Sequence, residues 1–361
     1  MIVGRHKSEL DTPALYVDLD RMERNIATLA SDFRKAGTAW RPHTKGIKVP
    51  AIAHKLLAAG AIGITCAKLS EAEVMAAAGI RDILIANQVV GPSKVARLVN
   101  LRRHADVMVA IDHLDNARAI SRAAGDAGVT VRVLVEVNTG MNRCGIAPGQ
   151  PTLELAREVA TLPGIALAGL MGWEGHVVGI QDPDEKKARC QEAVESLVRT
   201  ADLCRSTGLD IPIVSCGGSG SYKITSHIPG VTEIQAGGAV FCDLTYRRYG
   251  VDLDFSLFVV ATVISRPTAT RAIVDAGRKA MNGQTTMPQP KDLPGASLVK
   301  LNAEHGILQL QGPEVPLSVG DKVDFIVGYG DDTVFLHDQL YGVREEKVEV
   351  VWEVQGRGKL A

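Results

Sequence analysis

The chain has 361 residues and a formal net charge of −1 at pH 7, so its charge gives no reason to expect nucleic acid or an anionic membrane as a partner. No apolar run is long enough to span a membrane, and charged residues interrupt the N-terminus where a signal peptide has its apolar region. The six cysteines form no CxxC pair, which argues against a zinc knuckle or a disulfide scaffold. We expect a cytoplasmic protein that binds a small molecule.

Short apolar runs alternate with stretches rich in Ala, Leu, Glu and Arg, which is the pattern of βα units around a parallel sheet. One helical stretch begins with Ser70 and Glu73 in the spacing of a capping box. Eight such repeats predict fold class α/β, a closed (β/α)8 TIM barrel over residues 21–250. The predicted strands are residues 38–43, 63–68, 82–87, 106–112, 131–138, 167–173, 212–218 and 233–241.

The two ends of the chain have a different pattern. Residues 1–20 contain the strand-like run ALYVDLD, and residues 251–361 contain several strand-like runs without long helices. We therefore expect a C-terminal mostly-β domain, against which the N-terminal segment packs.

Unusual residues follow the predicted barrel strands at the end where barrel enzymes carry their chemistry. Lys45 follows the first strand, Arg143 follows the fifth, and Glu174 and His176 follow the sixth. All of them are expected on one rim of the barrel.

A glycine- and serine-rich turn follows the seventh strand, where such barrels often hold a phosphate. Glycines let backbone N–H groups converge on an anion, and serines add hydroxyl donors. A plain turn is the alternative. The candidate phosphate residues, including two glycines at the eighth strand, are Gly217, Gly218, Ser219, Gly220, Ser221, Gly237 and Gly238.

A lysine and a phosphate loop on the same rim together favour pyridoxal 5'-phosphate, held by its phosphate and by a Schiff base to Lys45. A solvated surface lysine is the alternative for Lys45, and Lys48 is a nearby competitor. His43 shares the face of Lys45 by strand alternation. It would either contact the cofactor or be an ordinary hydrogen-bonded histidine.

Five motifs, DTPALYVDLDRMERNI, RPHTKGIK, VEVNTGMNRCG, CGGSGS and EIQAGG, resemble those of the D-threonine aldolase and D-serine dehydratase family, whose barrel is of the alanine racemase type. The resemblance runs nearly end to end. It implies that Lys45 is the Schiff-base lysine, that Arg143 contacts the cofactor ring, and that the 217–221 loop with Gly237 and Gly238 holds the phosphate. It also implies a homodimer that acts on an amino acid.

Two positions depart from the family pattern. In the aldolases a histidine after the sixth strand removes the proton of the substrate hydroxyl, and alignment places Glu174 there, with His176 two residues later. A carboxylate can accept that proton if burial raises its pKa. The alternative for Glu174 is a salt bridge at the rim.

The second departure concerns a metal ion, which the family binds through a His-x-Asp or His-x-Cys pair. The corresponding residues here are Tyr329 and Asp331. Asp331 suits Mg²⁺ or Mn²⁺, whereas tyrosine is a poor ligand at neutral pH. Two alternatives stay open: a hydrated site on Asp331 with help from His305 or His337, or an aspartate that only holds a turn.

The resemblance favours a lyase that cleaves a β-hydroxy-D-amino acid into glycine and an aldehyde, with Lys45 and either Glu174 or His176 as catalytic residues. A racemase, epimerase or dehydratase acting at the Cα–H bond is the alternative. A cofactor carrier without turnover is a third hypothesis, which the long C-terminal β domain argues against.

Overall fold

The computed structural model describes residues 2–361, which form two compact units. We call residues 29–45, 52–237 and 359–361 the barrel unit, and residues 2–28, 46–51 and 238–358 the β unit. Helix α1 (Leu19–Ala36) contains the first boundary between them. Across residues 2–361, no helix combines the length and the apolar character needed to cross a membrane.

The barrel unit is built on eight parallel strands, and each predicted strand run overlaps one of them. Their order is β2-β9-β8-β7-β6-β5-β4-β3. A parallel bridge between His43 and Thr65 joins the two ends of this order, which closes the sheet. The strands are β2 (Ala39–Trp40), β3 (Ile64–Cys66), β4 (Asp82–Gln88), β5 (Asp106–Ile111), β6 (Val131–Val137), β7 (Ile165–Gly172), β8 (Ile213–Cys216) and β9 (Glu233–Ile234).

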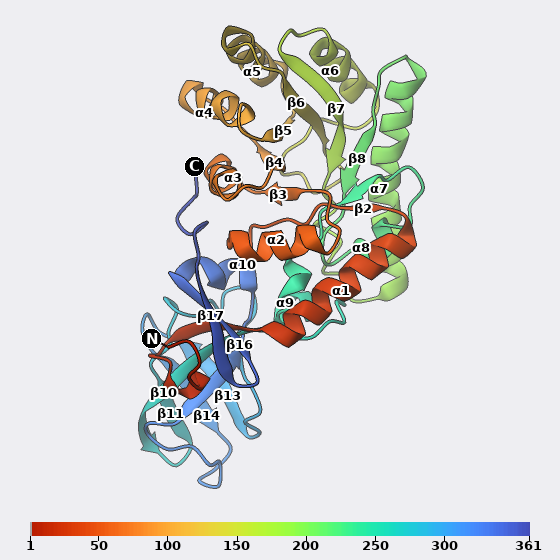
Figure 1. Cartoon of the computed structure of the whole chain (residues 1–361). Coiled ribbons are helices and arrows are strands. Elements are labelled where there is room, and N and C mark those ends of the chain that lie inside the picture. The colour runs from red at the N-terminus through yellow and green to blue at the C-terminus, as the bar shows by residue number, and fades with distance from the viewer. Residues whose placement is uncertain (1) are drawn as a thin grey trace. The chain divides into compact units, whose positions relative to one another are not determined.

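Helices follow the strands in the predicted alternation, and Figure 1 shows α4, α5, α6 and α7 along the outside of β4 to β8. The predicted capping box is wrong. Lys68 precedes the first helical residue of α3 without a side-chain cap, and the Glu73 carboxylate binds Arg97 instead, with Nε and Oε1 2.8 Å apart. The helices are α2 (Pro50–Ala58), α3 (Leu69–Ala77), α4 (Pro92–Arg102), α5 (Leu114–Ala127), α6 (Gln150–Ala160), α7 (Pro183–Ser206) and α8 (Tyr222–Thr225).

Apolar side chains of neighbouring strands fill the interior of the barrel unit. Leu84, Met108 and Leu134 are fully buried in one cluster from β4, β5 and β6. A buried ionic group lies beyond the end of β2, where the Arg41 guanidinium bonds the Glu233 carboxylate at 3.0 Å and Asp82 at 2.6 Å. Arg41 and Glu233 each expose only 3% of their side chains, so this ion pair is buried.

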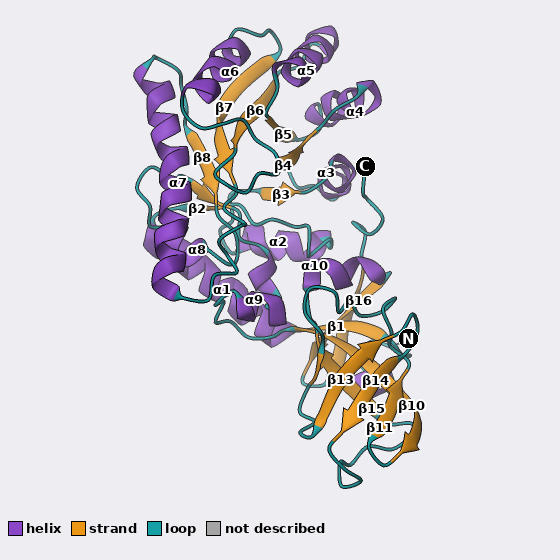
Figure 2. Ribbon diagram, turned by 180° about the vertical axis from the view of Figure 1, so that it is seen from behind, coloured by secondary structure: helices purple, strands orange, loops and turns teal. Residues whose placement is uncertain are grey.

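The β unit consists mostly of strands, as Figure 2 shows. The order along its main sheet is β13-β14-β11-β10-β1-β16-β17, and β15 pairs with β10 and β12. The N-terminal strand β1 is antiparallel to β10 and parallel to β16. The strands are β1 (Ala14–Asp18), β10 (Leu257–Thr268), β11 (Arg271–Val274), β12 (Gln289–Pro290), β13 (Ala296–Leu301), β14 (Gly306–Leu310), β15 (Lys322–Ile326), β16 (Gln339–Arg344) and β17 (Lys347–Glu353).

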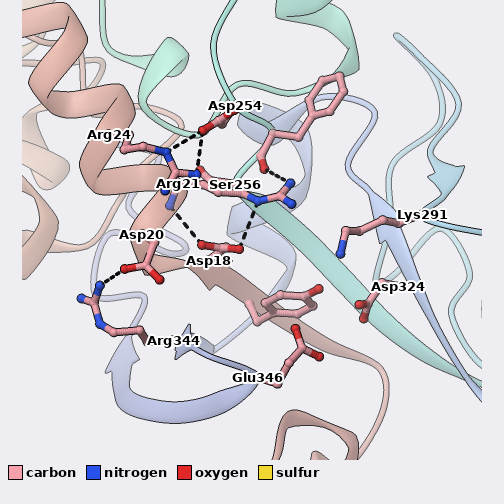
Figure 3. Close-up of polar contacts among 12 residues, drawn as sticks. Asp18, Asp20, Arg21, Arg24, Asp254, Ser256, Lys291, Asp324, Arg344 and Glu346 are labelled. Atoms are coloured by element: carbon pink, nitrogen blue, oxygen red, sulfur yellow. Dashed lines mark hydrogen bonds and ion pairs between the residues drawn. The ribbon is translucent and has the colours of Figure 1, made fainter.

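Ion pairs surround the point where β1 leads into α1, as Figure 3 shows. Arg21 bonds Asp18 at 3.2 Å, Arg24 bonds Asp254 at 2.9 Å, and Arg344 bonds Asp20. All of these side chains are partly exposed, so each pair contributes little by itself.

Gly169 and Gly125 of the barrel unit give a matched test of the packing. A Cβ atom at Gly169 in β7 would overlap the carbonyl oxygen of its β8 partner Ile213, whereas one at Gly125 in α5 would meet nothing within 4 Å. We expect Gly169→Ala to lower the free energy of unfolding by about 1–3 kcal/mol. Gly125→Ala should raise it by about 0.5–1 kcal/mol, because alanine loses less backbone entropy in a helix. Urea denaturation measures both, and equal effects would contradict the strand packing.

Candidate active site

The segment that carries Lys45 is fixed by its neighbours in the barrel unit. The Thr44 N–H donates to the Thr65 carbonyl at 2.8 Å, and the Thr44 hydroxyl donates to Glu71 at 3.0 Å. The Lys45 N–H donates to His43 Nδ1 at 3.3 Å. Thr44 is fully buried, whereas Lys45 is exposed. The bonds of Thr44 therefore fix the backbone in an orientation that leaves the lysine side chain outside the core.

Lys48, the competitor of Lys45, has a different environment. Its side chain is 7% exposed, it belongs to the β unit, and its carbonyl accepts the Gly356 N–H at 2.9 Å. The following helix begins only at Pro50. A buried lysine inside a hydrogen-bonded turn is less suited to a cofactor than the exposed Lys45.

The turn after β8 is held by a buried carboxylate. The Ser221 hydroxyl donates to Glu174 Oε1 at 2.5 Å, and the Gly217 N–H donates to Glu174 Oε2 at 3.3 Å. The Gly218 N–H donates in turn to the Ser221 hydroxyl at 3.1 Å. The Ser221 hydroxyl proton is therefore directed at Glu174, and this serine braces the loop from within.

Trp173 forms the other support of this loop. A Cβ atom at Gly218 would overlap the far edge of the Trp173 ring. Ser219 is 6% exposed and, with Gly220, completes the turn before α8. Only a glycine fits at position 218, and the backbone there lies directly against an aromatic surface.

The two glycines after β9 lie in different units. A Cβ atom at Gly237 would overlap the carbonyl oxygen of His43 in the barrel unit. Gly238 belongs to the β unit, where a Cβ atom would overlap the Tyr246 hydroxyl. Both positions therefore require glycine for close packing.

Glu174 differs from the base that the alignment suggests. Its side chain is 1% exposed, and burial raises its pKa, while the bonds from Ser221 and Gly217 oppose that rise. Both carboxylate oxygens already accept hydrogen bonds from the loop. This geometry supports an anchoring carboxylate for the 217–221 loop better than a base that meets the substrate.

His176 lies two residues beyond Glu174 and is exposed. A Cβ atom at Gly140, in the loop after β6, would lie 2.9 Å from His176 Nε2. The imidazole is thus placed where the loops after β6 and β7 meet, and it is open to solvent.

Arg143 lies in the loop after β6, whose shape is set by Asn138. The Asn138 side-chain oxygen accepts the N–H groups of Gly140 at 3.1 Å and Asn142 at 3.0 Å. The Arg143 guanidinium is half exposed and lies 3.8 Å from the carboxylate of Glu136 in β6. Contact of Arg143 with the cofactor ring stays a prediction.

Glu136 is a functional candidate that the sequence analysis missed. It is 4% exposed, it accepts a bond from Gln88 Nε2 at 2.6 Å, and burial raises its pKa, while Gln88 and Arg143 lower it. The signal was a single charged residue near the end of the apolar run VRVLVEVN. When ionised, this buried carboxylate partly balances the positive charge of Arg143, which lies 3.8 Å away.

The residues of the expected metal pair lie in the β unit with two partners that the sequence did not reveal. Tyr329 donates to Asp331 Oδ2 at 2.9 Å, and the Tyr246 hydroxyl lies 3.4 Å from Asp331 Oδ1. Asp243 accepts the Gly330 N–H at 2.6 Å and the Tyr246 N–H at 2.8 Å. Asp243 therefore joins α9 (Leu244–Arg248) to α10 (Gly330–Thr333), which carries Asp331.

The barrel unit has the groups that pyridoxal phosphate requires. Lys45 offers an exposed amine, and the 217–221 turn offers a glycine backbone that is packed too closely for a side chain at Gly218. Such a turn presents backbone N–H groups to a phosphate. The residues present fit this cofactor.

Comparison with known proteins identifies the family. The family model described as alanine racemase, N-terminal domain, matches residues 17–244, and the putative serine dehydratase domain matches residues 256–343. The D-threonine aldolase of Arthrobacter sp. is 37% identical over 98% of this chain and 95% of its own. The chain belongs to the D-threonine aldolase family. Enzymes of this family depend on pyridoxal phosphate.

Three further relatives extend the comparison. The crystal structure of D-threonine aldolase from Filomicrobium marinum matches with a TM-score of 0.97, at 38% identity over 99% of both chains. The 3-hydroxy-D-aspartate aldolase of Paracoccus denitrificans is 32% identical over 99% of this chain and 94% of its own. A D-threo-3-hydroxyaspartate dehydratase variant in a metal-free form, 31% identical over 96% of this chain and 98% of its own, has a TM-score of 0.89. Some members of the family therefore use a metal, and they carry out more than one reaction.

The anchoring of the loop by Glu174 can be tested through cofactor binding. Glu174→Gln and Ser221→Ala each leave a buried polar group without its partner, which costs about 1–3 kcal/mol. We expect the Kd for pyridoxal phosphate to rise by about 10- to 100-fold in both variants.

A fluorescence titration of the apoenzyme with pyridoxal phosphate measures this change. Glu192→Gln on the exposed face of α7 is the matched control, since Glu192 pairs only at the surface with Arg189. An unchanged Kd in Glu174→Gln together with a large loss of turnover would refute the anchoring role and support Glu174 as the base.

Proposed function

We propose that this protein is a pyridoxal-phosphate-dependent lyase that cleaves the Cα–Cβ bond of a β-hydroxy-D-amino acid. The products are glycine and an aldehyde. Support comes from the full-length similarity to D-threonine aldolase and 3-hydroxy-D-aspartate aldolase. The observation that carries the proposal is the presence in the barrel unit of both an exposed lysine, Lys45, and a glycine loop anchored by Glu174.

Lys45 would hold the aldehyde carbon of the cofactor covalently, and the 217–221 loop would bind its phosphate. When bound, pyridoxal phosphate supplies an electron-accepting ring for the bond that breaks at Cα. The buried Thr44 fixes the backbone on one side of Lys45, and Glu174 fixes the loop through Ser221 and Gly217. Two independent anchors would thus hold the two ends of one ligand.

His176 would take the proton of the substrate β-hydroxyl as the Cα–Cβ bond breaks, leaving the Cβ–O group as an aldehyde. Imidazole suits proton transfer near neutral pH, and this side chain is exposed at the strand ends. Glu174 is less suited because its two oxygens already accept bonds from the loop. The proton returned to Cα completes glycine.

The purified holoenzyme should release glycine and the matching aldehyde from D-threonine or 3-hydroxy-D-aspartate, but not from L-threonine. Lys45→Ala should abolish turnover and the visible absorbance of the bound cofactor, because the covalent link is lost. Aldehyde and glycine are measured by a coupled dehydrogenase assay and by chromatography. Borohydride reduction followed by peptide mapping should label Lys45, and a label on Lys48 would contradict its assignment.

The same assay distinguishes the alternative reactions at the Cα–H bond. Release of ammonia and a keto acid would indicate a dehydratase, for which a relative is known. Exchange of the Cα hydrogen with solvent deuterium, without aldehyde from any β-hydroxy amino acid, would indicate a racemase or epimerase. Either result replaces the lyase proposal.

If His176 is the base, its loss should slow turnover without weakening cofactor binding. His176→Ala should lower kcat by about 10²-fold or more, the usual effect of losing a general base. The absorbance of the bound cofactor should be unchanged. Among residues 2–361, the side chain that bonds the 217–221 loop from this segment is that of Glu174, and His176 makes no described hydrogen bond to the loop. His227→Ala, a histidine after α8, is the control. Full activity in His176→Ala would rule out this role.

A further inference from the structure

Asp331 of the β unit has a phenol at each carboxylate oxygen. Tyr329 donates to Oδ2 at 2.9 Å, and the hydroxyl of Tyr246 lies 3.4 Å from Oδ1. A phenol is a proton donor toward a carboxylate, whereas a metal ion at the same place needs electron pairs from its ligands. The two arrangements compete for the same oxygens.

Backbone packing limits the space on the Oδ1 side still further. A Cβ atom at Gly46 would overlap Asp331 Oδ1, so the main chain of Gly46 lies directly against that oxygen. Mg²⁺ and Mn²⁺ bind carboxylate oxygens closely and keep several waters in octahedral geometry. The approach to Oδ1 leaves little room for such a hydrated ion.

The phenols are held in place by more than their bonds to Asp331. The rings of Tyr246 and Tyr329 pack together with centroids 5.8 Å apart, and the Thr333 hydroxyl donates to the Tyr329 carbonyl at 2.9 Å. Asp243 binds the backbone N–H groups of Tyr246 and Gly330. The cluster is therefore a built arrangement, and Tyr329 does not simply swing away from the carboxylate.

The two histidines that the sequence offered as further metal ligands, His305 and His337, have other surroundings. His337 Nε2 is 2.8 Å from the carbonyl oxygen of Ala280, and His305 lies in the turn between β13 and β14. Among residues 2–361, no group of three or more His, Cys, Asp or Glu side chains could hold a metal ion. The donor set at Asp331 does not fit a divalent cation.

We propose that residue 329 decides metal binding in this chain: Tyr329 replaces the metal ion as the partner of Asp331, and a histidine at this position would create a metal site. A neutral imidazole nitrogen is a good ligand for Mn²⁺ beside a carboxylate, and it would remove the competing phenol donor. The presence of a metal in some relatives and its exclusion here then depend on one side chain. This inference concerns binding, so it stands whether or not the protein is a lyase.

The test measures Mn²⁺ binding to the holoenzyme. The protein is first dialysed against a chelator, Mn²⁺ is then added, and electron paramagnetic resonance reports the Mn²⁺ that remains free. The wild type should bind no stoichiometric Mn²⁺, and Tyr329→His should bind one ion per chain. The affinity for Mn²⁺ should rise by about 100-fold or more in Tyr329→His. Altering a residue that only supports a metal ligand already changes metal affinity by about 10- to 100-fold, and adding a ligand should have at least that effect. Asp331→Asn in the Tyr329→His background should remove this site.

Tyr341→His is the matched control, because Tyr341 also donates to a side chain two residues away, that of Gln339 at 2.9 Å. It should bind no Mn²⁺. Tight binding by the wild type that Asp331→Asn abolishes would overturn the proposal, and this comparison needs no change at position 329. A folded Tyr329→His variant with an intact cofactor spectrum but no Mn²⁺ would overturn it as well.

Discussion

The barrel unit depends on the parallel bridge between His43 and Thr65, which joins the chain after β2 to β3 and so connects the two ends of the pairing order. The His43 N–H also donates to the Gln235 carbonyl, and Thr44 is held by Thr65 and Glu71. A closed parallel sheet has no exposed edge, and its strand ends gather on one rim. Lys45 lies two residues after this bridge, so the closure of the sheet also fixes the backbone that carries the lysine.

Much of this architecture could be predicted from local patterns. The eight apolar runs marked the barrel strands, because a buried parallel strand needs continuous apolar residues whatever its partners are. Lys45 and the CGGSGS turn could be recognised since each lies at or near the C-terminal end of such a run. The last predicted strand, residues 233–241, was too long: only Glu233–Ile234 pair, and the glycines that follow close-pack instead.

The parts that could not be predicted depend on contacts between distant residues. The alignment placed Glu174 at the position of the family's histidine base, but its contact with the 217–221 loop depends on Ser221, 47 residues later. Tyr246 gave no signal, since its contact with Asp331 joins residues 85 positions apart. The capping box failed for the same reason: Glu73 had a better partner in Arg97 than in its own helix. Spacing in the sequence shows which groups are available, and packing decides how they pair.

The buried group of Arg41, Glu233 and Asp82 has a consequence for the evolution of this barrel. A Cβ atom at Gly63 would lie 2.5 Å from Arg41 Nη1 and 2.6 Å from the Asp82 carbonyl oxygen, so the backbone of this group, as well as its charge, confines position 63 to glycine. Losing one partner of a buried ion pair leaves the other charge buried without compensation, whereas replacing both partners by apolar residues is often tolerated. Substitutions at positions 41 and 233 are therefore expected to be accepted together or not at all, and homologues should show these two positions changing together.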